Sequence, residues 1–197
     1  MLRALCLDLM DTVVHDPYPE ALRAATGLDL ASVRRLRDPA VWPAFEIGAI
    51  DETQFAARYF AAPDGPHRFD LQAFNAIRRG GYRFVPGMAE LLDALAGRVE
   101  RYAASNYPVW IEDLRRALAL DRCFEGIYAS HRLGVRKPHP AFYRRLLDAI
   151  GHRPGSCLFV DDRSANCRGA AAAGMSTHLF DGAPGLRRRL RCEGILP

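Results

Sequence analysis

Short apolar runs that end abruptly at polar residues recur along the chain, and the first of them is the clearest. The largely apolar segment 2–7 ends at Asp8. A run of this length between polar residues is typical of a buried strand in a parallel sheet. Ligands bind just beyond the carboxyl ends of such strands, which places Asp8 where chemistry is usually done. An aspartate in this position can also cap the following turn or simply end the strand.

Between residues 20 and 79 the pattern changes to that of short amphipathic helices, with no clear strand. The expected helices cover residues 20–26, 29–37, 40–45, 52–61 and 71–79, and glycines and prolines separate them. A block of about 65 residues is large enough for a small helical cap but marginal as an independent domain.

From residue 84 onward, expected helices and strands alternate. The helices cover residues 88–96, 109–118, 140–150 and 165–173, and the strands cover 100–104, 126–129, 157–160 and 177–180. This alternation predicts a doubly wound, parallel α/β sheet of the Rossmann-like type. We therefore expect a core domain formed by residues 1–14 and 84–197. The helical cap, residues 15–83, is inserted after the first strand.

Polar residues follow the expected core strands at one edge of the sheet. Asp8 follows the first strand, Ser105 and Asn106 end the second, and Asp161 and Asp162 end the fourth. Lys137 lies on the loop after the third strand. Packing alone does not account for four polar elements at the same edge, so this edge is the candidate site.

Composition adds one observation about that site. The chain has 27 basic residues, and Lys137 is its only lysine. A lone lysine in a chain that otherwise uses arginine suggests a position that needs a compact ammonium group, although chance retention also explains it.

The remaining composition argues for a compact intracellular protein without a macromolecular ligand. Net charge is +4, and the dense basic run Arg187–Arg191 is better explained as a solvated helix face than as a nucleic-acid patch. The five cysteines lack metal-ligand spacing, which fits a reduced, cytoplasmic compartment. We expect no signal peptide and no membrane span.

The candidate site has the composition of a magnesium-dependent phosphate site. Asp8, Asp161 and Asp162 offer the hard oxygen ligands that Mg²⁺ prefers, and a cation there lets a carboxylate approach a phosphate. Lys137 would supply fixed positive charge and Ser105 a hydroxyl. A carboxylate pair that holds no metal and caps a helix is the alternative for Asp161 and Asp162.

Four segments, in order along the chain, resemble the motifs of the haloacid dehalogenase (HAD) superfamily. They are LCLDLMDTV (5–13), AASN (103–106), GVRKPHPAFY (134–143) and LFVDDRSANCRGAAAAGM (158–175). The resemblance implies a HAD hydrolase with a small helical cap of the C1 type. It also implies phosphatase activity on a small phosphorylated metabolite.

The resemblance also implies roles for individual residues. Asp8 would be the nucleophile and Lys137 its catalytic partner, while Ser105, Asn106 and Thr12 would bind the substrate. Mg²⁺ would be held by Asp8, the backbone carbonyl of Met10, Asp161 and Asp162, with Asp161 in direct contact. Asn166 would support that loop.

Met10 departs from the phosphatase pattern, which has a second aspartate at this position. A thioether can neither protonate a leaving group nor activate water, and such catalysis contributes roughly 10²–10⁴-fold. We expect a slow enzyme that favours good leaving groups, or one whose phosphorylated Asp8 persists. Asp11 is a candidate substitute for the missing acid, and His15 and Asp16 are further candidates.

Two other functions compete with this one. A weakly active or inactive HAD-fold protein that binds phosphate or a partner is the first, and Met10 favours it. Dehalogenation is the second, but metal-free dehalogenases lack the paired aspartates at 161 and 162. Trp42, Phe45, Tyr59 and Phe60 are expected in the core of the cap rather than in a substrate-reading surface. Neither the substrate nor the oligomeric state follows from the sequence.

Overall fold

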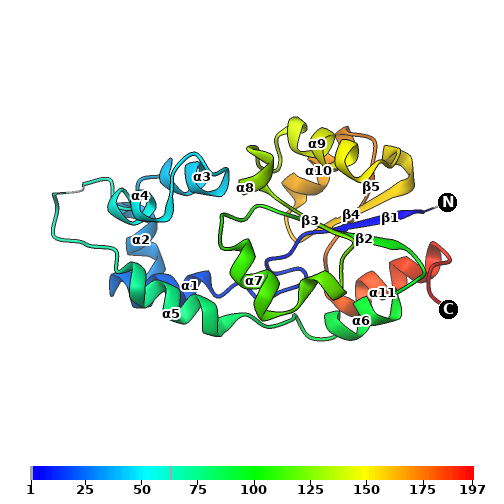
Figure 1. Ribbon diagram of the computed structural model, residues 1–197, viewed down its shortest axis with the longest axis horizontal. Coiled ribbons are helices and arrows are strands. Elements are labelled where there is room, and N and C mark those ends of the chain that lie inside the picture. Colours follow the sequence, from blue (N-terminus) through cyan, green and yellow to red (C-terminus); the bar gives the residue numbers. More distant parts are fainter. Residues whose placement is uncertain (1, 63) are drawn as a thin grey trace.

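A five-stranded, fully parallel sheet forms the centre of the protein in a computed structural model that describes residues 2–62 and 64–197 (Figure 1). The strand order is β3-β2-β1-β4-β5. Their bounds are β1 Ala4–Leu7, β2 Glu100–Ser105, β3 Gly126–Ala129, β4 Cys157–Asp161 and β5 Ser176–Leu179. Every expected strand is present within one or two residues, and the α/β fold class is confirmed.

The register of the sheet determines which residues meet at its carboxyl edge. Leu7 of β1 is paired with Ala103 of β2 on one side and with Val160 of β4 on the other. Asp8, the next residue, therefore lies level with Ala104 and Asp161.

Helices cover both faces of the sheet. The bounds are α6 Met88–Ala94, α7 Ile111–Ala117 and α11 Ala183–Cys192 for one group, and α8 Ser130–Leu133, α9 Pro140–Ile150 and α10 Ser164–Ala172 for the other. Leu5 and Leu7 pack with the first group, whereas Ala4 and Cys6 pack with α9 and α10. Alternate residues of β1 thus face opposite layers, and burial on both sides explains why the strand is almost entirely apolar.

The sequence pattern does not predict the shortest elements of the fold. These are α8 and the 3₁₀ turns Leu120–Arg122 and Pro154–Ser156. α11 was expected only as a helix face around Arg187–Arg191, and Leu186 and Leu190 anchor that helix in the core.

The first five helices lie beyond the carboxyl edge of the sheet (Figure 1). They are α1 Tyr18–Thr26, α2 Leu30–Leu36, α3 Val41–Glu46, α4 Glu52–Ala57 and α5 Leu71–Gly81. Aspartate side chains cap three of them, Asp29, Asp51 and Asp70, by accepting backbone N–H groups of the first turn. We call these helices the cap helices; their status as a separate domain, residues 15–83, stays a prediction.

Aromatic side chains pack the cap helices against α7. Phe45 and Phe55 stack with ring centroids 4.6 Å apart, and Trp110, beside α7, contacts Phe45 edge-on at 4.8 Å. α4 ends at Ala57, earlier than expected, because the chain leaves the helix to place Phe60 in a β-bridge with Arg37. No helix in the described part of the chain has the length and apolar character needed to cross a membrane.

Candidate active site

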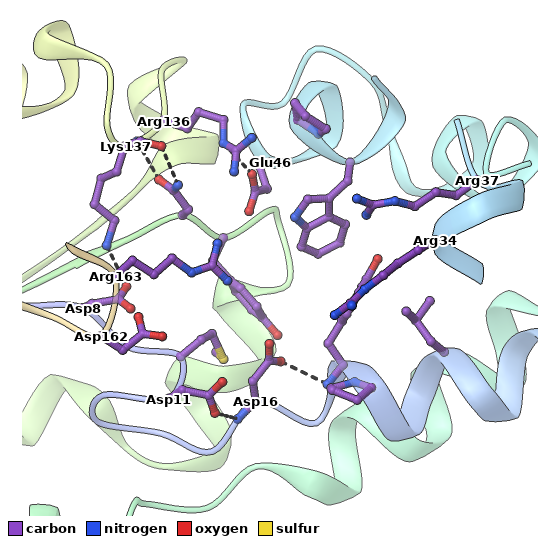
Figure 2. A pocket seen from close by; sticks show the side chains of 18 of the residues that line it. Asp8, Asp11, Asp16, Arg34, Arg37, Glu46, Arg136, Lys137, Asp162 and Arg163 are labelled. Carbon is purple, nitrogen blue, oxygen red and sulfur yellow. Dashed lines mark hydrogen bonds and ion pairs between the residues drawn. The ribbon is translucent and has the colours of Figure 1, made fainter. Parts of the chain in front are cut away.

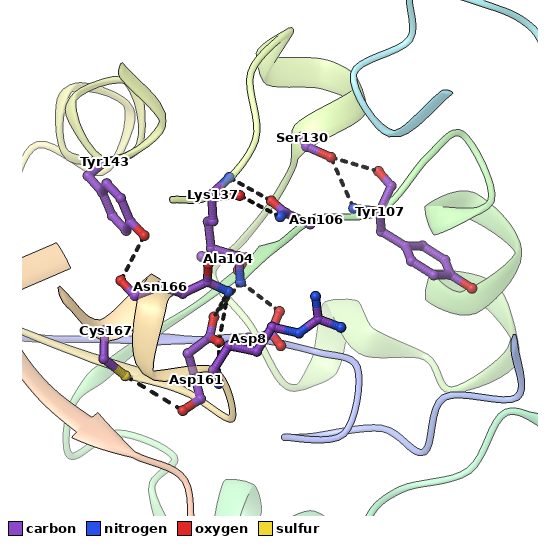
Figure 3. Close-up of polar contacts among 11 residues, drawn as sticks. Asp8, Ala104, Asn106, Tyr107, Ser130, Lys137, Tyr143, Asp161, Asn166 and Cys167 are labelled. Atoms are coloured by element: carbon purple, nitrogen blue, oxygen red, sulfur yellow. Dashed lines mark hydrogen bonds and ion pairs between the residues drawn. The ribbon is translucent and has the colours of Figure 1, made fainter. Parts of the chain in front are cut away.

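The Lys137 ammonium group lies at the centre of the carboxyl edge of the sheet (Figure 3). Its Nζ donates to Asp8 Oδ1, to Asp161 Oδ2 and to the carbonyl oxygen of Ala104, each at 2.7 Å. An ammonium has three N–H donors, so all three are used. The sequence prediction that Asp8, Lys137 and Asp161 meet at one edge is confirmed.

Asn106 positions the main chain of Lys137. Its side-chain amide donates to the Lys137 carbonyl at 2.9 Å, and its Oδ1 accepts the Lys137 backbone N–H at 2.8 Å. Both ends of the Asn106 side chain are thereby engaged with the loop that carries the lysine. This contact gives Asn106 a positioning role that the sequence did not predict.

Asp8 and Lys137 are both buried and influence each other's protonation. Burial raises the pKa of Asp8 to about 6, the Lys137 charge opposes that rise, and Asp161 adds to it. For Lys137, burial lowers the pKa, but Asp8 and Asp161 together raise it above its usual value. The lysine therefore stays charged, and it holds Asp8 as the carboxylate near neutral pH.

Asp161 and Asp162 differ in how far their carboxylates are engaged. Asp161 is fully buried and accepts hydrogen bonds from Lys137, from the Asn166 side chain and from the backbone N–H of Arg163. Asp162 is half-buried, lines a cavity and forms no hydrogen bond through its carboxylate among the described residues. Burial and then the neighbouring Asp161 raise its pKa.

The three carboxylates form a candidate metal centre. One oxygen atom from each of Asp8, Asp161 and Asp162 lies within 4.8 Å of the others. Clustered carboxylate oxygens of this kind suit Mg²⁺, which takes one or two carboxylates and fills its other positions with water or phosphate. The donor set therefore fits the ion.

Two buried hydroxyls near this edge have no hydrogen-bond partner within the described part of the chain. They are Thr12 Oγ1 and Ser105 Oγ, and both residues are almost fully buried. Buried polar groups are nearly always paired, so these two hydroxyls retain unused hydrogen-bonding capacity, although neither residue lines the cavity described below.

The turn after Met10 engages the Asp11 carboxylate with the backbone. Asp11 adopts a left-handed backbone conformation, with φ of 57°, which aspartate tolerates better than most residues. Its Oδ1 accepts the backbone N–H of Asp16 at 3.2 Å. Met10 itself lines the cavity, while His15 does not and instead faces Glu20 at 3.9 Å.

Asp16 also borders the cavity, from the segment that leads into α1. Its Oδ1 accepts the Tyr18 backbone N–H at 3.0 Å. Burial raises the pKa of Asp16 to about 6, although that hydrogen bond lowers it. Of the proposed substitutes for the missing acid, Asp11 and Asp16 reach the cavity.

A cavity of about 380 Å³ connects the carboxyl edge of the sheet to the cap helices (Figure 2). Asp8, Lys137 and Asp162 lie at the sheet end, and Arg34 and Arg37 lie at the cap end. This volume is within the range of small-molecule sites.

The aromatic residues expected in the core of the cap divide into two groups. Phe45 and Phe60 are buried there and do not line the cavity, as expected. Trp42 and Tyr59 pack with the same core and also line the cavity, which the expectation did not include. Sequence reasoning missed this because a short amphipathic helix can present an aromatic side chain to a core and to a cleft at the same time.

Glu46 and Arg136 form an ion pair across the cap and core, and the sequence did not single out either residue. Arg136 Nε lies 2.7 Å from Glu46 Oε2, and the Glu46 carbonyl accepts the Ser130 hydroxyl at 2.6 Å. Burial raises the pKa of Glu46 to about 7, although Arg136 and Trp42 oppose the rise. The only signal in the sequence was that Arg136 precedes Lys137.

Known proteins resemble this chain along nearly its whole length. The family model for haloacid dehalogenase-like hydrolases matches residues 2–174. Flavin mononucleotide hydrolase 1 of Arabidopsis thaliana, a chloroplast protein by its name, is 36% identical over 192 residues, which is 97% of this chain and 77% of that protein. A phosphatase of Mycobacterium tuberculosis is 35% identical over 174 residues, covering 82% of this chain and 78% of its own length.

Solved structures agree on the fold. A HAD family enzyme of Bacteroides thetaiotaomicron in a magnesium complex superimposes with a TM-score of 0.77 at 17% identity, over 96% of this chain and 98% of that one. The same enzyme with magnesium and inorganic phosphate gives a TM-score of 0.73 at 16% identity, over 92% of this chain and 96% of that one.

Proposed function

Because the chain belongs to the haloacid dehalogenase-like hydrolase family, whose phosphatase members it resembles, we propose that it is a Mg²⁺-dependent phosphatase that acts through an aspartyl-phosphate on Asp8. The observation that carries this proposal is the Lys137 ammonium, 2.7 Å from both Asp8 and Asp161. It keeps Asp8 charged at the end of a central strand.

Asp8 then acts as the nucleophile. One of its carboxylate oxygens attacks phosphorus, the bond from phosphorus to the leaving oxygen breaks, and the phosphoryl group is transferred to Asp8. Water next attacks the phosphorus, the bond to Asp8 breaks, and inorganic phosphate leaves. Lys137 offsets the negative charge on Asp8 and on the phosphoryl group throughout.

The residues that would hold the ion are Asp8, the Met10 carbonyl, Asp161 and Asp162. The hydrogen bonds favour Asp162 over Asp161 as the direct ligand, because the Asp161 carboxylate is already occupied by Lys137, Asn166 and Arg163. When bound, Mg²⁺ neutralises phosphate charge and orients the phosphoryl group.

Ser105 and Thr12 contact the phosphoryl oxygens in this proposal. Their orphaned hydroxyls support the assignment, since each can donate one hydrogen bond to an oxygen anion. Asn106 acts indirectly, by holding the Lys137 main chain.

The loss of an acid at Met10 makes the enzyme slow on substrates with poor leaving groups. It also lets the phosphorylated form of Asp8 persist, because no carboxylate at position 10 activates the water. The competing proposal, a HAD-fold protein that only binds phosphate, shares this observation. The intact Asp8, Lys137 and Asp162 favour the enzyme.

The substrate is a small phosphate monoester in this proposal. Since a relative 36% identical is a flavin mononucleotide hydrolase, flavin mononucleotide is the first substrate to test. The cavity, with Tyr18 and Trp42 in its walls, presents aromatic surface to a flat group. A cytoplasmic location stays a prediction.

The experiment measures phosphate release from flavin mononucleotide and from 4-nitrophenyl phosphate, with Mg²⁺ and with a chelator. The enzyme proposal expects Mg²⁺-dependent release that Asp8→Asn abolishes, fastest with the nitrophenyl ester. Release that continues in the chelator contradicts the proposed Mg²⁺ dependence. Folded protein that releases no phosphate from either ester supports the binding protein instead.

A further inference from the structure

Two arginines border the end of the cavity that is farthest from Asp8. Arg34 lies on α2 and Arg37 directly follows it, so the two side chains are three residues apart and share one side of the helix. Figure 2 shows both reaching toward the cavity from the side opposite Asp8 and Lys137.

These two guanidinium groups are unpaired among the residues that the structure describes. Neither forms an ion pair or donates a hydrogen bond there. The other arginines of the cavity wall differ. Arg136 is paired with Glu46 at 2.7 Å, and the charge of Arg163 opposes the rise in the pKa values of Asp16 and Asp162. The cap end therefore has a surplus of positive charge.

The carboxylates of the cavity are concentrated at the opposite end. Asp8, Asp11 and Asp162 lie around the carboxyl edge of the sheet, away from Arg34 and Arg37 (Figure 2). Asp16 lies between the two ends in that view, and Glu46, the remaining carboxylate of the wall, is paired with Arg136. A phosphate monoester bound at Asp8 would thus extend its leaving group toward two arginine side chains that have no carboxylate partner among the described residues.

The wall near these cations is aromatic and carries hydroxyls. The Tyr18 and Trp42 rings are 4.5 Å apart between centroids, and both line the cavity. Tyr59 lines the same cavity as Arg37, and burial raises the pKa of its hydroxyl although Tyr18 and Arg37 oppose the rise. Aromatic faces and a planar guanidinium together suit a flat group with oxygen atoms on its edge.

We propose that Arg34 and Arg37 form a specificity site for the leaving group. The substrates it selects are phosphate monoesters whose leaving group is flat and carries an oxygen acceptor (carboxylate, phosphate or imide carbonyl) at the end far from the ester. The proposal rests on the assignment of Asp8 as the phosphoryl acceptor. Guanidinium groups bind such acceptors with two parallel hydrogen bonds, which gives both affinity and orientation.

Two matched esters test the proposal in turnover. Phenyl phosphate and 4-carboxyphenyl phosphate differ only by a carboxylate at the far end, and flavin mononucleotide adds an uncharged imide. Arg34→Ala and Arg37→Ala are compared with Arg35→Ala, an exposed neighbour on the same helix that contacts Ser32 and does not line the cavity.

We expect Arg34→Ala and Arg37→Ala each to raise KM for 4-carboxyphenyl phosphate about tenfold, with kcat nearly unchanged, because a charge-assisted hydrogen bond is lost. KM for phenyl phosphate should stay within about twofold in both variants, and Arg35→Ala should match the wild type on each ester. A similar rise for flavin mononucleotide would assign the site to imide acceptors as well; no rise would restrict it to anions. Equal effects on the phenyl and carboxyphenyl esters, or no effect on either, overturn the proposal.

Binding to a variant that cannot turn over separates this proposal from the proposed catalysis. Calorimetric titration of 4-carboxyphenyl phosphate into Asp8→Asn, with and without Arg34→Ala, needs no hydrolysis. Weaker binding caused by Arg34→Ala supports the specificity site even if the wild type proves inactive. Unchanged binding contradicts it even if the wild type is an active phosphatase.

Discussion

Lys137 Nζ lies 2.7 Å from Asp8 Oδ1 although 129 residues separate the two in the chain. The parallel register creates this contact, because β1 is central and its end lies between Ala104 and Asp161. The ammonium therefore serves the fold as well as the proposed chemistry, since it is the counter-charge of two buried carboxylates.

Replacing Lys137 by methionine keeps most of the side-chain length and removes the charge. We expect Lys137→Met to lower the free energy of unfolding by about 3–5 kcal/mol, because Asp8 and Asp161 are left buried without a cation. Urea denaturation at neutral pH measures the loss. The double variant Lys137→Met/Asp8→Asn should recover part of the lost stability, because one of the two unpaired charges is removed. A Lys137→Met variant as stable as the wild type would contradict this account of the contact.

Met10→Asp restores an acid at the position where a thioether now stands. We expect the variant to hydrolyse alkyl phosphates at least roughly 10²-fold faster than the wild type, with a smaller gain on 4-nitrophenyl phosphate, whose leaving group needs no proton. Steady-state rates on the two esters give the comparison. Asp11→Asn tests whether Asp11 substitutes for the acid; we expect it to change neither rate by more than about twofold, because the Asp11 carboxylate accepts the backbone N–H of Asp16. If the wild type hydrolyses alkyl phosphates as fast as Met10→Asp does, the wild type already has a general acid.

Arg78 connects α5 to the segment around α7. It is almost fully buried, its Nη2 lies 2.8 Å from Asp113 Oδ2, and its guanidinium carbon lies 4.5 Å from the centroid of the Trp110 ring. Arg78→Ala should cost about 3 kcal/mol of stability in a thermal or urea melt, because an ion pair and packing are lost together.

Arg79 offers a matched control, since its Nε contacts the same Asp113 oxygen at 3.0 Å while the side chain is 60% exposed. Arg79→Ala should cost less than about 1 kcal/mol. Equal losses from Arg78→Ala and Arg79→Ala would mean that burial does not decide the contribution of these contacts.

Glu46 should make stability depend on pH. Burial raises its pKa from the usual 4.5 to about 7, so the folded protein favours the protonated form. The stabilisation is then complete below about pH 4.5 and is lost as the pH rises through about 7, by at most about 3 kcal/mol. The free energy of unfolding should fall more between about pH 5 and pH 8 for the wild type than for Glu46→Gln. Parallel curves for the two proteins would show that the Glu46 pKa is not raised.

The sequence predicted the sheet and the contacts at its edge because both depend on local patterns. Apolar runs set the strands, and polar residues at their ends converge wherever parallel strands share an edge. Asp8, Lys137 and Asp161 could therefore be placed together from the sequence alone. Helices such as α1 and α5 followed from their amphipathic spacing.

The cap end of the cavity could not be predicted in the same way. Arg34 and Arg37 look like any exposed arginines of a short helix, and only the packing of α2 against α1 within the cap helices turns them toward the cavity. The pair Glu46 and Arg136 is 90 residues apart along the chain, with no shared pattern. Long-range contacts between a cap and a core depend on tertiary packing rather than on periodicity.

Trapping the phosphorylated enzyme tests the central proposal most directly. During turnover of 4-nitrophenyl phosphate with Mg²⁺, the protein is quenched and reduced with borohydride, which converts an acyl phosphate on aspartate into homoserine. Peptide mass spectrometry should find homoserine at position 8 in the wild type and less of it in Met10→Asp, whose restored acid speeds hydrolysis of the intermediate. Homoserine at another aspartate, or turnover without modification of Asp8 in either protein, would contradict the assignment of Asp8 as the nucleophile.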